Sequence, residues 1–136
     1  MSTFRFRKKT DYGLMLMTIL AREGRGEVVS AKTMQELGLP RSFLVKIAKE
    51  LIKAGMVGAK EGRGGGYYLK KESKKISLRQ LVETLEGKVC STACVMGNYH
   101  CPMEGECQHS EVMKKLSGEI EEVLEKYSLD ELVRHK

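Results

Sequence analysis

One stretch in the second half of the chain holds four cysteines, Cys90, Cys94, Cys101 and Cys107. Thiolates are soft ligands, and several of them from one loop suit either an iron–sulfur cluster or a zinc ion. The wide gaps between the last three cysteines lack the closely spaced pair that structural zinc sites use. The alternatives are a cluster, zinc or free thiols, in that order of preference once the rest of the chain is considered.

The segment that carries these cysteines, residues 88–109, shows no helical or strand periodicity and contains Gly97, Pro102 and Gly105. Long loops without secondary structure are uncommon in compact domains and usually have a function. A bound metal centre is such a function, so the loop itself favours a role for the cysteines as ligands.

No apolar run is long enough to span a membrane, and the basic N-terminus is not followed by the apolar core of a signal peptide. We therefore expect a cytoplasmic protein with no membrane partner. In that reducing compartment, cysteines act as metal ligands or redox groups more often than they form disulfides.

The elements that must position the loop are mostly helices. Apolar periodicity and capping residues predict a first helix over residues 10–22, with Thr10 as its N-cap, and further helices over residues 30–37, 41–54 and 78–85. Two short apolar stretches, residues 56–59 and 66–69, flank a glycine-rich and cationic tip at residues 61–65, which predicts a two-stranded hairpin.

The third predicted helix has one apolar face and one polar, basic face. The apolar face comprises Phe43, Leu44, Ile47, Ala48, Leu51 and Ile52, and the other carries Ser42, Val45, Lys46, Lys49 and Lys53. Such a helix can lie in the major groove of DNA, where lysine meets phosphates or guanine and serine meets base edges. Arg63, at the hairpin tip, can reach a minor groove or the backbone.

We therefore expect DNA contacts from Arg41, Ser42, Lys46, Lys49 and Arg63. The formal charge of +6 agrees with a polyanionic partner, and most lysines and arginines lie within residues 1–75. The alternative is an ordinary solvated helix face beside a flexible loop.

A narrow apolar stripe predicts a long helix near the C-terminus, with a short final helix capped by Ser128. The stripe comprises Val112, Leu116, Ile120, Val123 and Tyr127. Its width resembles a coiled-coil seam, which favours a homodimer, although the stripe could instead cover the body of the protein. A dimer would place two recognition helices about 34 Å apart on a pseudo-palindromic operator in double-stranded DNA.

The predicted fold is mainly α: a winged helix-turn-helix with a two-stranded wing and a long C-terminal dimerisation helix. We divide it into a DNA-binding region (residues 1–87), a cluster-binding loop (88–109), and the dimerisation and C-terminal helices (110–136), all in one folding unit. The three histidines lie near no Ser or Cys in a triad-like pattern, so we expect no enzyme.

These residues together resemble the Rrf-two family of bacterial winged-helix regulators. The matching pieces are residues 10–14, residues 44–57, residues 62–67, and the cysteines at positions 94, 101 and 107. The resemblance implies that Cys94, Cys101 and Cys107 hold an iron–sulfur cluster, [2Fe–2S] or [4Fe–4S], with a fourth ligand that differs among relatives.

Three residues are candidates for that fourth ligand. In the nitric oxide sensor branch of the family it is an acid at the start of the first helix, where Asp11 stands here; otherwise Asp11 is an acid favoured by the helix dipole. In the iron–sulfur regulator branch it is a histidine shortly after the third cysteine, and His109 is one residue off that spacing. Cys90 lies outside the three-cysteine pattern and would complete a fully thiolate site.

The function that follows is a transcriptional regulator, a repressor, whose DNA affinity is controlled by the cluster. Gain, loss or nitrosylation of the cluster would reshape the loop, and the dimer helix beside it would carry the change to the recognition helices. The alternatives are a small iron–sulfur redox protein and a zinc-stabilised DNA-binding protein without a sensing role.

Overall fold

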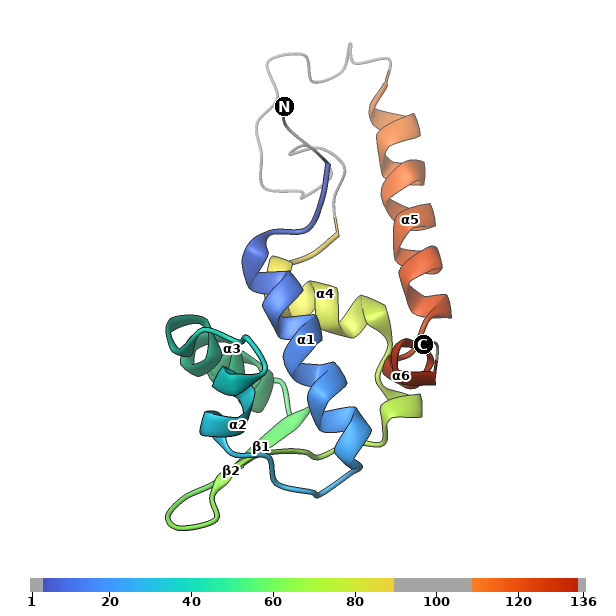
Figure 1. The fold of residues 1–136 in the computed structure, drawn as a ribbon. Helices are drawn as coiled ribbons and strands as arrows, with labels where there is room; N and C mark the ends of the chain where they lie inside the picture. Colours follow the sequence, from blue (N-terminus) through green and yellow to red (C-terminus); the bar gives the residue numbers. More distant parts are fainter. Residues whose placement is uncertain (1–3, 90–108, 135–136) are drawn as a thin grey trace.

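The computed structural model describes residues 4–89 and 109–134, and all four cysteines lie outside these ranges. The chain forms a helical body with a hairpin projecting at one end and a long helix standing beside the body (Figure 1). Its elements are α1 (Lys8–Glu23), α2 (Ala31–Glu36), α3 (Arg41–Lys53), β1 (Val57–Lys60), β2 (Gly66–Leu69), the 3₁₀ turn η1 (Ser73–Lys75), α4 (Leu78–Glu86), α5 (Ser110–Lys126) and α6 (Leu129–Arg134). This arrangement confirms the winged helix-turn-helix prediction.

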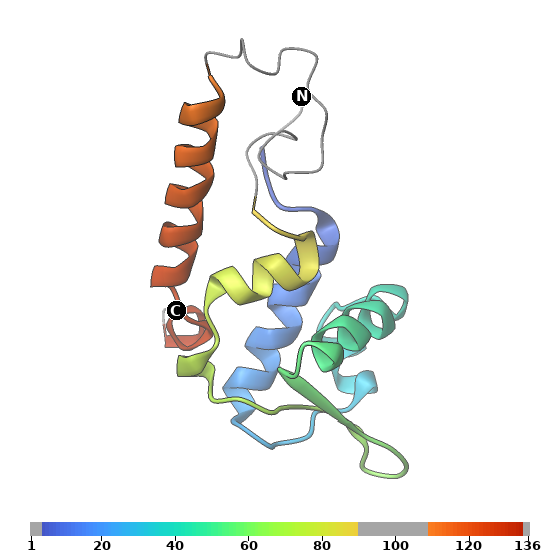
Figure 2. The same cartoon turned by 180° about the vertical axis from the view of Figure 1, so that it is seen from behind.

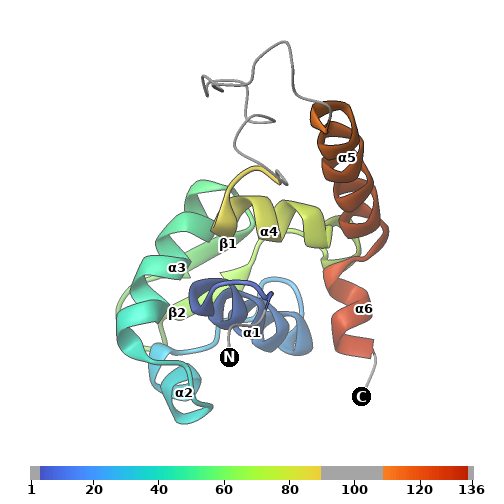
Figure 3. The ribbon, with the colours of Figure 1, turned by 90° about the horizontal axis from the view of Figure 1, so that it is seen from above.

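Helix α1 runs through the centre of the body. Seen from above, α3 lies on one side of it and α6 on the other, while α4 runs along a third side between them (Figure 3). Its side chains Leu16, Met17 and Leu20 are fully buried because three other helices and β2 pack around them. The rest of the core comes from all parts of the body: Met34, Leu39, Leu44, Ile47, Leu51, Leu69, Ile76, Leu81, Leu85 and Leu129.

Several predicted helix ends are confirmed by their caps. The Ser30 side chain accepts a hydrogen bond from the amide of Thr33, and Ser77 forms a complete capping box with Gln80. Gly55 follows α3 with φ of 81°, a left-handed conformation that costs glycine little. These local signals fix where α2, α3 and α4 begin or end.

The predicted start of the first helix is wrong. Helix α1 begins at Lys8, two residues before Thr10, and Thr10 is fully buried inside it. The Thr10 hydroxyl donates a hydrogen bond to the carboxylate of Glu86 at the end of α4. A tertiary contact, and not a helix cap, explains this threonine.

One member of the predicted apolar face of α3 is also misplaced. Leu44, Ile47, Ala48 and Leu51 are buried, but Ile52 is 36% exposed. Phe43 and Ile52 lie at opposite edges of this face. Tyr12 of α1 covers Phe43, with ring centroids 4.8 Å apart, whereas the edge that carries Ile52 stays open.

The hairpin is a two-stranded antiparallel sheet in which Val57 pairs with Leu69 and Lys60 pairs with Gly66. At its base, Val29 adds a third segment, because its backbone exchanges two hydrogen bonds with Tyr67 at 2.8 and 2.9 Å. Gly66 lies directly beside this crossing. The wing is therefore tied to the chain that leads into α2.

Helix α5 stands beside the body and meets it along α4 (Figures 1 and 2). Arg79 of α4 donates to Glu121 of α5 at 3.0 Å. Beyond α5 the chain returns to the core: the Leu129 amide donates to the Ile76 carbonyl at 2.8 Å, and Leu129 is fully buried. Helix α6 thus closes the body, while much of α5 is left exposed.

We predict that Gly66→Ala destabilises the protein more than Gly62→Ala. A Cβ atom at position 66 would overlap the carbonyl oxygen of Val29, whereas at position 62, where φ is 83°, it would meet open space. The expected losses of unfolding free energy are about 3 kcal/mol for position 66 and about 1 kcal/mol for position 62. Urea unfolding followed by circular dichroism measures both, and equal losses would contradict the close approach at Gly66.

Candidate nucleic-acid interface and metal centre

The turn between α2 and α3 sets the direction of α3. Gly38 has φ of 105°, and the buried Leu39 donates its amide to the carbonyl of Met34 at 3.1 Å. Pro40 immediately precedes the first residue of α3, and its carbonyl accepts from the amide of Leu44 at 2.9 Å. The first turn of α3 is therefore fixed to the core at Leu39, with Arg41 at the surface.

The outward face of α3 carries the predicted DNA-binding residues. Arg41, Ser42, Lys46 and Lys49 are all exposed. Val45 lies among them and is 54% exposed. The structure thus brings three cations, a hydroxyl and an apolar contact onto one helix face.

Arg63 is exposed at the tip of the wing. Gly62 and Gly64 on either side of it have φ of 83° and 72°, and the amide of Gly65 donates to the carbonyl of Gly62 at 3.0 Å. Only glycine adopts these angles at low cost, so the tip is narrow and without bulky neighbours of Arg63. The wing projects from the same end of the body as α2 (Figure 1).

An ion pair that the sequence analysis missed keeps the outer face of α3 cationic. Lys9 of α1 donates to Glu50 at 2.6 Å, and the two side chains are 20% and 34% exposed. Glu50 is the one acid of α3, so its charge is neutralised by α1 and does not oppose a polyanion. The residues are 41 positions apart, and no local pattern connects them.

A second missed contact joins the beginning of α1 to the end of α4. The Glu86 carboxylate accepts hydrogen bonds from the Thr10 hydroxyl and from the Arg7 amide and guanidinium, the latter two at 3.0 Å. The Arg7 guanidinium also donates to the carbonyl of Glu86 at 3.0 Å. We call this group, formed by Arg7, Thr10 and Glu86, the α1–α4 clamp.

The clamp lowers the pKa of Glu86. Burial of the carboxyl raises that pKa, but the hydrogen bonds from Thr10 and Arg7 and the charge of the Arg7 guanidinium outweigh burial. Glu86 is therefore ionised well into the acidic range, and the clamp is held by a charged acceptor.

In the sequence, the clamp residues are next to the candidate ligand Asp11 and to the start of the cysteine segment. Asp11 directly follows Thr10 and is exposed in the first turn of α1, and the segment with the cysteines begins two residues after Glu86. His109 is exposed at the start of α5, where that segment ends. Within residues 4–89 and 109–134, no three potential ligands gather at one point, and Cys90, Cys94, Cys101 and Cys107 lie outside these residues.

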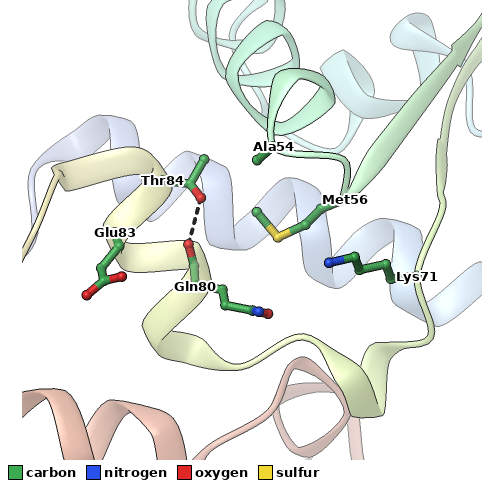
Figure 4. Close-up of a pocket in the computed structure, with 6 residues that line it drawn as sticks. All are labelled: Ala54, Met56, Lys71, Gln80, Glu83 and Thr84. Atoms are coloured by element: carbon green, nitrogen blue, oxygen red, sulfur yellow. Dashed lines mark hydrogen bonds between the residues drawn. The ribbon is translucent and has the colours of Figure 1, made fainter.

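A surface cavity of about 280 Å³ lies between α3, β1 and α4 (Figure 4). Three of its polar side chains already have partners: Gln80 belongs to the capping box, Glu83 pairs with Arg79 at 3.1 Å, and Thr84 donates to the Gln80 carbonyl at 2.7 Å. The cavity shows no set of polar groups converging on a ligand, and we assign it none.

A basic helix presented by a helix-turn, next to a two-stranded wing with an arginine at its tip, defines a winged helix-turn-helix DNA-binding protein. The family model for Rrf2, described as an iron-dependent transcriptional regulator, matches residues 6–135. The chain therefore belongs to the Rrf2 (Rrf-two) family, as its sequence motifs indicate.

Proteins with similar sequences are named as transcriptional regulators of the same type. An rrf2-like HTH-type transcriptional regulator from Rhodobacter capsulatus is 32% identical over 124 residues, covering 88% of this chain and 81% of that protein. The HTH-type transcriptional regulator NsrR from Oceanobacillus iheyensis is 28% identical over 132 residues, covering 96% and 90%.

Solved structures show the same fold. CymR, the global cysteine regulator of B. subtilis, has a TM-score of 0.77 and 25% identity, covering 98% of this chain and 99% of that one. T. potens IscR has a TM-score of 0.72 and 27% identity, covering 96% and 87%. The family consists of transcriptional regulators and not enzymes, as predicted. In the described part of the chain, no helix is long and apolar enough to cross a membrane.

We predict that Glu86→Gln lowers stability at neutral pH and that the loss shrinks in acid. Because the pKa of Glu86 is lower in the folded than in the unfolded chain, its carboxylate stabilises the fold above the unfolded pKa and ceases to do so as the pH falls through the folded pKa. Replacing a charged acceptor by a neutral one should cost about 1–2 kcal/mol at pH ~7.

Urea unfolding at neutral and acidic pH measures this difference. Glu122→Gln, at an exposed position of α5, is the matched control and should have little effect at either pH. A loss that is the same at both pH values would show that the charge of Glu86 is not what the clamp uses.

Proposed function

We propose that this protein is a transcriptional repressor whose affinity for DNA is set by an iron–sulfur cluster. In this proposal, residues 1–87 bind DNA, residues 88–109 hold the cluster, and residues 110–136 form the dimer, all within one folding unit that acts in the cytoplasm. Arg41, Ser42, Lys46 and Lys49 enter the major groove, and Arg63 reaches the adjacent minor groove or backbone. The exposure of these residues on α3 and the wing supports this assignment.

The observation that carries the cluster proposal is the α1–α4 clamp. It holds Glu86 at the end of α4, two residues before the cysteine segment, against the helical turn that contains Asp11. In this proposal, the thiolates of the segment meet the carboxylate of Asp11 at this end of α1. The relatives named IscR and NsrR carry the same domain over nearly the whole of this chain.

The donor set fits an iron–sulfur cluster. Cys94, Cys101 and Cys107 would supply thiolates, and Asp11, Cys90 or His109 would supply the fourth ligand, for a [2Fe–2S] or [4Fe–4S] centre. A cluster bound there would supply iron–thiolate and iron–sulfide bonds that change on oxidation, reduction or reaction with nitric oxide. The exposure of Asp11 and His109 leaves both side chains at the protein surface on the flanks of the cysteine segment.

The first turn of α1 offers a route from the cluster to the recognition helix. Lys9 and Tyr12, on either side of Asp11, both contact α3, through Glu50 and Phe43. A change at Asp11 would therefore bias the position of α3 directly, in addition to any change that α5 carries. Such control requires that the cluster stabilise the DNA-competent and incompetent arrangements unequally.

We also propose that the protein is a homodimer formed through α5. Along this helix Val112, Leu116, Val123 and Tyr127 are 40–59% exposed, and they belong to the predicted apolar stripe. Within the described residues, α4 packs on another side of α5, so the stripe is open to a second copy. A dimer would present two α3 helices to a pseudo-palindromic operator.

The cluster is tested by native mass spectrometry and visible absorption of protein purified without oxygen. We expect a dimer carrying two iron–sulfur clusters, and we expect Cys94→Ala to lose the visible absorbance and alter operator affinity while keeping its circular dichroism. Replacing Asp11, Cys90 and His109 by alanine, one at a time, identifies the fourth ligand by the change in spectrum. Glu23→Ala, at the far end of α1, is the control.

Two results would contradict the cluster. Colourless zinc-loaded protein would indicate a structural metal, since zinc–thiolate sites do not absorb visible light. Metal-free protein that iron and sulfide do not reconstitute would indicate a thiol-based role. Either result leaves DNA binding by α3 and the wing untouched.

For the dimer, we predict that Val123→Glu shifts the protein to monomers. A carboxylate in the middle of an apolar seam would be buried without a partner, which should weaken association at least about tenfold. Analytical ultracentrifugation measures the shift, with Glu122→Gln as the neighbouring control. A Val123→Glu protein that remained fully dimeric would exclude the stripe as the interface.

A further inference from the structure

A dense group of cations lies at the base of the wing, away from the predicted recognition residues. The segment from residue 70 to residue 75 contains four lysines and one glutamate, and Arg25 lies against it. We define the basic strip as Arg25, Lys70, Lys71, Lys74 and Lys75. All five residues are exposed.

The backbone under the basic strip is well fixed. The Arg25 guanidinium donates to the carbonyl of Lys70 at 3.0 Å, the amide of Gly26 donates to the carbonyl of Leu69 at 2.9 Å, and Leu69 is buried. The side chains therefore project from a rigid edge of the wing sheet and not from a mobile tail. A fixed backbone means that only the side chains lose entropy when they bind a partner.

The charge of the strip is largely uncompensated. Glu72 is the acid in the segment, and it pairs with Arg25 at 3.6 Å while the two side chains are 52% and 61% exposed. Exposed pairs of this geometry are weak. Asp130 of α6 also reaches the segment and accepts a hydrogen bond from the Ser73 hydroxyl at 3.1 Å, but its charge is paired with Arg134 at 2.8 Å. A shallow hollow of about 240 Å³ is lined by Arg25, Lys70, Lys71, Lys75 and this one glutamate.

The strip continues the wing. The segment runs from the end of β2 along the edge of the body toward α6, and the wing tip projects from its other end (Figures 1 and 2). Lys60 and Arg63 lie at or near that tip, so cations extend from the tip to the base. The Lys71 side chain reaches toward Met56 in the neighbouring cavity (Figure 4). Lys70 and Lys75 both line the hollow and are exposed, so we use them to test the strip.

We propose that the basic strip is a second DNA contact, which binds the phosphate backbone next to the groove that the wing enters. Lysine is a compact point charge on a flexible stem, suited to phosphates and not to bidentate reading of bases. The continuity with the wing and the surplus of positive charge identify the partner as DNA. This contact adds affinity and fixes orientation without sequence preference.

The proposal rests on DNA binding by α3 and the wing but not on the cluster. Its test compares the wild-type protein with the double variant Lys70→Gln/Lys75→Gln on an operator duplex selected from a random pool. Both substituted side chains are exposed, and circular dichroism verifies that the fold is intact. Lys114→Gln/Lys115→Gln, on exposed positions of α5, removes the same charge far from the wing.

The readout is the salt dependence of affinity, measured by fluorescence anisotropy. Two lost phosphate contacts should make the slope of log affinity against log salt shallower by about 1.8. When the salt is raised from about 50 to about 200 mM, the factor by which the variant's affinity falls should be about ten times smaller than the factor for the wild type. The α5 control should keep the wild-type slope.

Phosphate ethylation interference locates the contact. The wild-type protein should show sensitive phosphates that the double variant no longer shows, next to those affected by Arg63→Ala. An unchanged slope and an unchanged interference pattern, with operator binding retained, would overturn the proposal and leave the strip to an acidic protein partner. Loss of all operator binding by Lys46→Gln would instead concern the recognition helix, so the two failures are distinguishable.

Discussion

The close approach of α1 and α4 at Gly13 is the constraint on which the arrangement of the other elements depends. A Cβ at this position would overlap the Leu85 side chain, which is itself fully buried. Because glycine lets the two helices meet here, the end of α4 reaches the beginning of α1, and Arg7 and Thr10 can both bind Glu86. The α1–α4 clamp therefore depends on this packing, and so does the position of the end of α4, which lies two residues before the cysteine segment.

The first turn of α1 serves three parts of the molecule at once. Lys9 neutralises Glu50 on α3, Thr10 binds α4, and Tyr12 covers Phe43 at the edge of α3. Asp11 lies between these residues in the sequence, and its side chain is exposed. A short stretch of sequence thus keeps the recognition face cationic, anchors the end of α4 and leaves the Asp11 carboxylate exposed.

Helix α5 differs from the other helices in how it is held. Arg79 of α4 pairs with Glu121 and Glu125 of α5, and the buried residue of α5 is a serine, Ser117, so polar contacts join this helix to the body. Its large apolar side chains are exposed along the stripe, while α6 supplies Leu129 to the core. This distribution of exposed apolar side chains is the observation that supports the proposed dimer.

The sequence by itself determined the elements and most of their limits, because capping residues, glycines and the period of apolar residues act within a few positions of one another. Ser30, Ser77 and Gly55 mark helix ends, and the exposed face of α3 followed from its periodicity. The roles of Thr10, Glu50 and Arg25 were decided by tertiary structure alone, since their partners lie 76, 41 and 45 positions away and no local pattern encodes such pairs. Ile52 was misplaced for the same reason: whether the edge of an apolar helix face is covered depends on which neighbouring helix packs there.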